Sequence, residues 1–239
     1  MLKNIDYSKI LFFDIETVPN VYNYNELDKQ GQDLWDKKTK FLQKRDEMSA
    51  DEIYNMAGIY AEFGKVICIS LGLVVQKNGE NQIRLKSIAG KDEKKLLKDF
   101  IDILNSYYNT NEFIFCAHNG KEFDIPFLSR RILINELKLP NILNIAGKKP
   151  WEIRHLDTME LWKFGDYKHY TSLELLSYVF KIPTPKNDID GSQVAFVYYE
   201  EDNLERIIKY CEKDVIATIQ LFRKYQGHSL IENDFIQVV

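Results

Sequence analysis

At 239 residues, with 45% hydrophobic and 28% charged residues, the chain has the size and composition of one soluble globular domain, and we expect residues 1–239 to form it. Its longest apolar runs, such as 10–13 and 66–75, are too short for a membrane span and no signal pattern begins the chain, so we expect a cytoplasmic protein without a membrane partner. The net charge of −4 argues against a protein that coats nucleic acid through a broad basic surface, but it permits an enzyme that grips a few phosphates through bound metals.

The first predicted elements are strands. Residues 10–16, Ile-Leu-Phe-Phe-Asp-Ile-Glu, form a nearly continuous apolar run that then admits two acids, a pattern typical of a central strand buried on both faces. Residues 66–76 and 82–88 follow as β-rich segments, and the Asn78-Gly79 pair between them is a strong hairpin signal. We predict that these two strands are antiparallel.

Helices and further strands make up the rest of the chain. We predict a helix over 92–108, a strand over 113–118, a helix over 124–137, a short strand at 153–156, a helix over about 172–180 and a final helix over about 202–225. Thr171 and Glu174 fit a capping box at the start of the helix near 172. This order predicts an α/β fold with a mixed sheet covered by helices. Residues 26–47, which are charged and helix-prone, and 141–150 are interpreted as excursions from the core, with a helical insertion around 20–60.

Asp14 and Glu16 are the first candidate site residues. They are two apart on a strand, so their carboxylates point to the same side and can share a divalent cation. A D-x-E pair alone is common in an acidic chain, and solvated loop acids are the usual explanation. The buried segment directly before this pair strengthens the metal interpretation.

Asp124 follows a predicted strand and begins a predicted helix. It fits the N-cap of that helix, which would leave it a purely structural role. However, α/β folds place their ligands where neighbouring strands end, so Asp124 is also a candidate for the same site. Asn119 and the small Gly120 in the same loop allow tight backbone packing there.

Tyr210 and Asp214 lie four apart on the final helix and share one face. The alternative is a core tyrosine and a solvated aspartate. Asp214 lies near the apolar stripe of the helix, however, where an unpaired acid is costly and a metal is a suitable partner. We therefore place both residues in the candidate site.

The cysteines, Cys68, Cys116 and Cys211, are odd in number and form no C-x-x-C pair. We interpret them as buried or half-buried free thiols. Neither a disulfide framework nor a zinc site is expected.

Three acidic blocks occur in order: Asp-Ile-Glu at 14–16, Asn-Gly-Lys-Glu-Phe-Asp at 119–124 and Tyr-Cys-Glu-Lys-Asp at 210–214. They resemble the motifs of the DEDD exonucleases, in the subclass with tyrosine. The chain is similar to the proofreading exonuclease domain of family B DNA polymerases, and especially to its stand-alone bacterial relatives. Residues 63–70, 156–162 and 190–194 also resemble segments of that family. The resemblance implies a ribonuclease-H-like fold, in which three antiparallel strands lead into parallel ones, together with 3′-5′ exonuclease activity and no polymerase activity.

The resemblance also implies a mechanism with two divalent ions, Mg²⁺ or Mn²⁺. Four crowded carboxylates cannot all stay ionised unless cations neutralise them. Asp14 is expected to bridge both metals, Glu16 and Asp214 to complete the inner coordination, and Asp124 to hold the second metal directly or through water. The metals would orient a water for in-line displacement of the 3′ oxygen. Tyr210 is expected to align that water rather than to remove its proton, because an unperturbed phenol titrates at about 10.

Several residues beside the motifs are candidates for contact with substrate. Phe123, Phe127, Leu128 and Trp162 could stack on or wedge between terminal bases, and Asn119 is a further candidate. Core packing is the alternative for most of the apolar residues. The basic cluster Lys37, Lys38, Lys40, Lys44 and Arg45 either guides a strand or forms a solvated helix face.

The expected substrate is single-stranded DNA or a frayed 3′ end. A ribonuclease resembling the ribonuclease D branch uses the same acids and tyrosine and is the main alternative, since the sequence shows no reader of the 2′ hydroxyl. A noncatalytic nucleic-acid-binding module is a third hypothesis. The intact set of acids argues against it.

Overall fold

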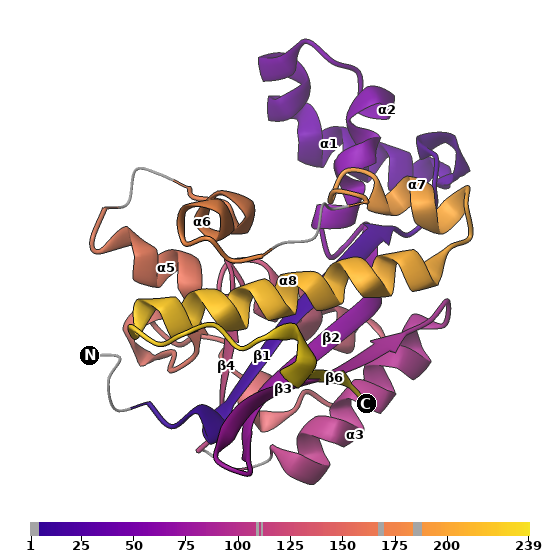
Figure 1. Cartoon of the computed structure of the whole chain (residues 1–239). Coiled ribbons are helices and arrows are strands. Elements are labelled where there is room, and N and C mark those ends of the chain that lie inside the picture. Colours follow the sequence, from indigo (N-terminus) through magenta and orange to yellow (C-terminus); the bar gives the residue numbers. More distant parts are fainter. Residues whose placement is uncertain (1–4, 109, 111, 167–169, 184–187) are drawn as a thin grey trace.

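The centre of the computed structural model, which describes residues 5–108, 110, 112–166, 170–183 and 188–239, is a six-stranded sheet (Figure 1). Its order is β5-β4-β1-β2-β3-β6, formed by β1 (Ile10–Pro19), β2 (Gly64–Lys77), β3 (Glu80–Ala89), β4 (Ile114–Ala117), β5 (Leu156–Asp157) and β6 (Ile236–Val238). Strands β1, β2 and β3 are antiparallel neighbours, whereas β4 runs parallel to β1 and β5 parallel to β4. The predicted α/β, ribonuclease-H-like sheet is confirmed. β6, which runs parallel to β3, was not predicted.

Helices cover both faces of this sheet. Figure 1 shows α8 crossing one face, and the core contacts place α3 and α4 against the other. The α-helices are α1 (Lys29–Asp46), α2 (Ala50–Ile53), α3 (Glu93–Tyr107), α4 (Asp124–Ile134), α5 (Thr158–Lys163), α6 (Leu173–Val179), α7 (Val194–Tyr199) and α8 (Leu204–Tyr225). Short 3-10 turns are η1 (Tyr7–Lys9), η2 (Tyr24–Glu26), η3 (Tyr54–Ile59), η4 (Asn141–Leu143), η5 (Pro150–Glu152) and η6 (Asn233–Phe235). In the described part of the chain, no helix is long and apolar enough to cross a membrane.

Strand β1 is buried on both faces, as its apolar sequence predicts. Ile10 and Phe12 belong to the core cluster that includes residues of α8, whereas Leu11 and Phe13 belong to the cluster that includes α3 and α4. Because side chains alternate along a strand, the even-numbered residues of β1 face α8. This alternation decides which side of the sheet receives the acids further along the strand.

The turn between β2 and β3 is the predicted Asn-Gly hairpin. Lys77 pairs with Glu80, and the two residues between them, Asn78 and Gly79, have φ angles of 54° and 84°. Positive φ at both positions is the geometry that such a two-residue turn requires. The hairpin therefore sets the register of the two strands over their whole length.

Several elements differ from the sequence predictions, for instance α4, which ends at Ile134 instead of residue 137. The strand predicted at 153–156 begins only at Leu156, because the chain before it forms η5 and an irregular segment. Helix α6 is capped by Ser172, whose Oγ accepts the Leu175 N–H at 3.2 Å, so the predicted capping box of Thr171 and Glu174 does not form. Helix α7 had not been predicted at all.

Residues between β1 and β2 form a helical insertion of α1, α2 and η3, so the charged stretch at 26–47 is mostly α1. Trp35 is fully buried there and packs edge-on against Tyr54, with ring centroids 5.3 Å apart. Its indole N–H donates to the Ala50 carbonyl at 2.8 Å. The insertion thus has a small core of its own.

A buried ion pair joins α3 and α4 to the start of β2. Arg131 donates two hydrogen bonds to the carboxylate of Glu93, at 2.9 and 2.5 Å, and a third to the Ala61 carbonyl at 2.8 Å. The same carboxylate accepts the Val66 N–H at 2.7 Å. All polar groups of the pair are therefore satisfied, as a buried charge requires.

We predict that Arg131→Ala lowers the free energy of unfolding by about 3–5 kcal/mol, because it leaves the Glu93 carboxylate buried without its counter-charge. Urea unfolding followed by circular dichroism measures this loss. The matched control is the neighbouring exposed arginine, Arg130→Ala, which should change stability by less than about 0.5 kcal/mol. Equal effects of the two substitutions would contradict a structural role for the pair.

Candidate active site

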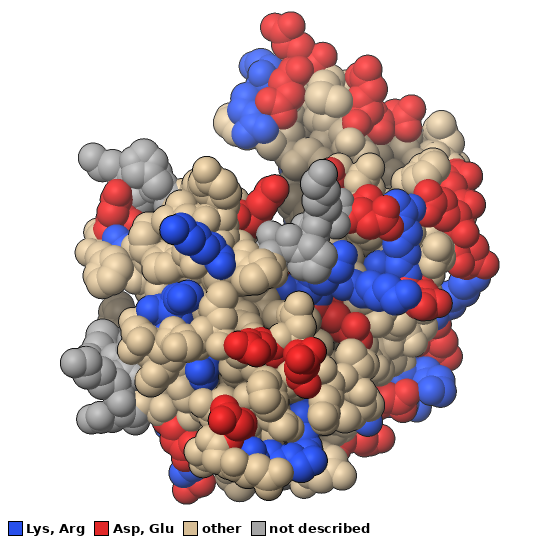
Figure 2. Space-filling model, in the orientation of Figure 1, with Lys and Arg blue, Asp and Glu red and all other residues tan. Residues whose placement is uncertain are grey.

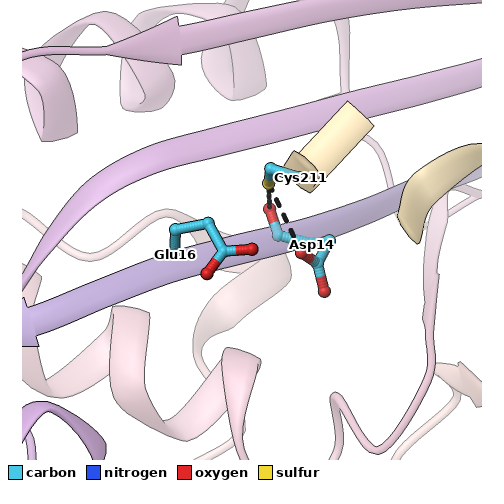
Figure 3. A group of neighbouring side chains, drawn as sticks. All are labelled: Asp14, Glu16 and Cys211. Carbon is cyan, nitrogen blue, oxygen red and sulfur yellow. Dashed lines mark hydrogen bonds between the residues drawn. The ribbon is translucent and has the colours of Figure 1, made fainter. Parts of the chain in front are cut away.

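Asp14 and Glu16 lie on the side of β1 that faces α8. Ligand atoms of Asp14, Glu16 and Cys211 all lie within 4.8 Å of one another (Figure 3). The two carboxylates therefore share one side of the strand, as the alternation of side chains predicts. The strand has an irregularity in its pairing directly after Glu16, between Glu16 and Thr17.

Cys211 of α8 is a member of this group that the sequence had not suggested. It is a buried free thiol, as are Cys68 and Cys116, which agrees with the prediction for all three. Its S–H is placed to donate to the Asp14 carbonyl at 3.4 Å and to the Asp14 carboxylate at 3.3 Å (Figure 3). The available signal was its spacing, because Cys211 precedes Asp214 by three residues and so lies on the same side of the helix.

Asp124 reaches β1 from the start of α4. Its carboxylate accepts the backbone N–H of Ile15 at 3.2 Å, directly between Asp14 and Glu16, and only 3% of the residue is exposed. The N-cap position belongs to Phe123, so the alternative that Asp124 serves only as the N-cap is not what the structure shows. Asp124 instead joins the acids of β1.

The loop before Asp124 is held by Asp157, the N-cap of α5. The buried Asp157 carboxylate accepts four backbone N–H groups, from Asn119, Lys121, Met159 and Glu160, at 2.9 to 3.2 Å. The resemblance includes residues 156–162, but the sequence alone predicts no role for Asp157. Through these bonds Asp157 positions the backbone that leads into Asp124.

Gly120 is required in that loop by the close approach of β4. A Cβ on Gly120 would lie 2.4 Å from the Cβ of Ala117 and 3.4 Å from the Asp124 carboxylate. Asn119 beside it has a φ of 64°, a left-handed conformation that asparagine tolerates better than most residues. The tight packing predicted for this loop is therefore present.

Tyr210 and Asp214 complete the site from α8. Together with Asp14 they line a cleft of about 790 Å³. The rest of its lining comes from the residue after β4, from α6 and the residues just before it, from the segment before α7, and from α8: His118, Tyr170, Ser172, Leu173, Glu174, Ser177, Ile189, Asp190, Gln193 and Ala217. This volume lies within the range of small-ligand sites, roughly 300–1,000 Å³.

His118, the residue after β4, holds one wall of this cleft in place through two hydrogen bonds. Its Nε2 lies 3.0 Å from the Thr171 carbonyl, which can only accept, so Nε2 carries the proton. Its Nδ1 lies 2.9 Å from the Thr158 hydroxyl. Burial lowers the pKa of His118, which keeps the ring neutral at physiological pH. His118 therefore ties the chain leading into α6 to the sheet.

Burial raises the pKa of each acid in the site, and nearby negative charges add to the effect. Burial, followed by the charges of Asp124 and Asp214, raises the pKa of Asp14 well above its usual value, and burial with the charge of Asp14 does the same for Glu16. Burial raises the pKa of Asp124 to about 7 and that of Asp214 to about 6. Such a cluster carries negative charge that a divalent cation can neutralise, and its carboxylate oxygens are the ligands that Mg²⁺ and Mn²⁺ prefer.

The residues proposed to stack on bases lie mostly outside the cleft. Phe127 is 1% exposed within the core of α3, α4 and the sheet, so it is corrected to a core residue, as is the buried Leu128. Trp162 is half-buried between Phe180 and Tyr225. Among the described residues that line the cleft, none is Asn119, Phe123 or Trp162, and a contact of these three with substrate stays a prediction.

Comparison with known proteins gives a family match over more than half of the chain. A family model described as a predicted 3′-5′ exonuclease related to the exonuclease domain of PolB matches residues 59–235. This match includes Asp124, Tyr210 and Asp214, and it begins after β1 and α1. A DNA polymerase from Pyrococcus glycovorans is 23% identical over 146 residues, which cover 56% of this chain and 18% of the polymerase. The chain thus spans less than a fifth of the length of that relative.

We predict that the metal-free protein loses stability as pH rises from about 4 to about 7. Asp124 and Asp214 ionise near 3.8 in the unfolded chain but only at about 7 and about 6 in the folded one. The folded state therefore binds more protons across this range, and the free energy of unfolding falls as pH rises. Calorimetric melting in EDTA should show the fall, and saturating Mn²⁺ should raise the melting temperature most at the high-pH end.

The isosteric variant Asp124→Asn is the control, because it removes one of the titrating groups. Its melting temperature in EDTA should depend less on pH than that of the parent chain. An unchanged pH dependence would contradict the assignment of these pKa values to the acidic cluster.

Proposed function

The chain belongs to the family of predicted 3′-5′ exonucleases related to the exonuclease domain of PolB, and on that premise we propose that it removes nucleotides from the 3′ end of single-stranded DNA with two divalent metal ions. The observation that carries the proposal is the convergence of acids from β1, α4 and α8 beside Tyr210 and a cleft. Acids that converge from three elements far apart in sequence repel one another. Bound metal ions would neutralise this repulsion.

Asp14, Glu16, Asp124 and Asp214 would hold the two ions, Mg²⁺ or Mn²⁺. When bound, the ions would supply Lewis acidity that activates the attacking water and stabilises the leaving 3′ oxygen. Cys211 lies behind Asp14 and orients its carboxylate through the thiol hydrogen bond. Asp157 acts one step further away, by holding the loop that presents Asp124.

Tyr210 stays protonated under working conditions. Burial and the charges of Asp214, Glu16 and Asp14 raise the pKa of its phenol well above the usual value. It therefore acts as a hydrogen-bonding group that aligns the attacking water, because a phenol with a raised pKa is a poor source of phenolate. The proton of the water must leave by another route.

The preference for a single strand rests on charge and size. The cleft of about 790 Å³ has acids in its floor and suits a frayed end rather than a duplex. The likeness to a DNA polymerase favours DNA over RNA as the substrate. A ribonuclease D-like activity remains the second candidate, because the same acids and tyrosine would serve both.

The polarity test uses a 5′-labelled single-stranded DNA incubated with Mg²⁺ or Mn²⁺. The expected product is a ladder that shortens stepwise from the 3′ end, faster than the same strand in a blunt duplex. EDTA and Asp14→Asn should both abolish the ladder. Internal fragments as first products would overturn the exonuclease proposal, faster cleavage of the matching RNA would favour the ribonuclease, and no cleavage with intact metal binding would favour a noncatalytic module.

We predict that Tyr210→Phe lowers kcat by about 10- to 10,000-fold, the range for loss of a positioned proton-transfer or water-aligning group. Affinity for Mn²⁺, measured by calorimetry, should stay nearly unchanged because the phenol is not a ligand. Tyr178→Phe on the exposed side of α6 is the matched control and should leave kcat intact. Loss of Mn²⁺ binding in Tyr210→Phe, or an unchanged kcat, would contradict the role given to Tyr210.

A further inference from the structure

We propose that the outer face of α1, formed by Leu34, Lys37, Lys40, Phe41 and Lys44, binds the single strand upstream of the 3′ end that enters the cleft. This inference rests on the proposed function and extends it to a second contact surface. The matched part of the family model begins at residue 59, so α1 lies outside it.

The outer face is the side of α1 that turns away from the core of the insertion. Trp35 and Thr39, four residues apart, are fully buried and mark the inner side. With 3.6 residues per turn, the five residues of the outer face fall within one arc opposite that side. Phe41 is 74% exposed and Leu34 is 51% exposed, so large apolar side chains lie in solvent among the lysines.

Among the described residues, the lysines of this face form no ion pair, whereas two of the nearby acids are already in ion pairs. Asp33, which lies in the same arc, pairs with Lys29 at 2.7 Å, and Asp46 pairs with Arg45. The Asp36 carboxylate accepts the Tyr24 hydroxyl at 3.2 Å. Lys37, Lys40 and Lys44 take part in no ion pair or hydrogen bond with any residue in the described part of the chain.

A row of free ammonium groups with an exposed aromatic ring among them matches the chemistry of a single strand. Lysines attract the phosphates, and an aromatic face accepts an unpaired base by stacking without regard to sequence. A duplex hides the faces of its bases and cannot use Phe41. The partner that fits is therefore a single-stranded nucleic acid.

The position of α1 relative to the catalytic acids is set by contacts at the end of β1. The Thr17 hydroxyl, next to Glu16, donates to the Gly58 carbonyl at 2.8 Å, and the Asn20 N–H donates to the Phe63 carbonyl at 2.7 Å. The Tyr199 hydroxyl of α7 donates to the Pro19 carbonyl at 2.6 Å. Pro19 lies three residues after Glu16, or roughly 10 Å along an extended strand.

The pictures agree with this placement. Figure 1 shows the insertion projecting from the body beside α7, with α6 on the other side of the gap. Figure 2 shows Lys and Arg side chains among several Asp and Glu side chains on this projecting part, and a notch between it and the neighbouring lobe. A strand that leaves the cleft on that side would meet the insertion next.

The test compares Lys37→Gln/Lys40→Gln/Lys44→Gln with a control triple of the same charge change, Lys86→Gln/Lys94→Gln/Lys98→Gln, on β3 and α3. Binding of a labelled 20-nucleotide DNA is measured by fluorescence anisotropy in EDTA, where no hydrolysis is expected, over a series of salt concentrations. Three lost phosphate contacts should reduce the slope of log affinity against log salt by about 2, since each contributes about 0.7 for a single strand. The control triple should keep the parent slope.

Two further measurements separate this surface from the cleft. In Mg²⁺, the triple variant should raise KM for the 20-nucleotide strand about tenfold or more while leaving kcat, and KM for a trinucleotide, unchanged, because a trinucleotide occupies the cleft alone. Phe41→Ala should weaken binding of the long strand by roughly 5- to 150-fold, the range for loss of one base–aromatic stack. Phe41 is exposed, so its removal leaves the fold intact.

Equal behaviour of the α1 triple and the control triple would overturn the inference and leave the face as solvated lysines. The inference would also be overturned if the α1 triple variant bound DNA as tightly as the parent chain but lost binding to vesicles of phosphatidylserine and phosphatidylcholine. That result would favour a membrane contact. If the parent chain fails to shorten even the trinucleotide, the proposed function fails. The anisotropy comparison still decides the α1 surface in that case.

Discussion

Mutual repulsion among carboxylates held in a poorly solvated place is the constraint on which the rest of the structure depends. Asp14 and Glu16 lie on the central strand of the sheet, and Asp124 and Asp214 are brought to them from α4 and α8. Water cannot solvate these groups fully, so each raises the pKa of its neighbours. Protons or cations reduce the repulsion among the carboxylates. Protonation depends on pH, and cation binding depends on metal concentration.

Keeping the acids together against their repulsion requires a rigid frame. Gly72 of β2 lets α8 lie directly on the sheet, because a Cβ there would come within 2.6 Å of Val215 and 2.8 Å of Ile219. On the other side, the four backbone hydrogen bonds to Asp157 hold the loop before Asp124. These devices fix the backbone rather than the acids themselves. The acids themselves are held by few hydrogen bonds: Asp124 accepts the Ile15 N–H, and Asp14 accepts the Cys211 thiol.

The same acids create a difficulty for a polyanionic substrate. A nucleic acid is repelled by the floor of the cleft unless cations are bound there, and the chain as a whole has a net charge of −4. Attraction must then come from a place where positive charge is not cancelled. The free lysines of α1 are such a place, and the insertion holds them at the end of the strand that carries the acids. Under this proposal, the surface that attracts the nucleic acid and the site that cleaves it are separate, and β1 connects them.

Local patterns were enough to predict the features that depend on neighbouring residues alone. The period of two along a strand placed Asp14 and Glu16 on one side of β1, the helical period placed Tyr210 and Asp214 on one face of α8, and Asn78-Gly79 specified the hairpin. The contact of Asp124 with the Ile15 N–H spans 109 residues, and no local pattern encodes it. Likewise the burial of Phe127, the thiol of Cys211 behind Asp14, and the short elements β6 and α7 depend on how helices pack on the sheet. Periodicity reports which face of an element is buried, whereas the neighbour it is buried against is decided only when the elements assemble.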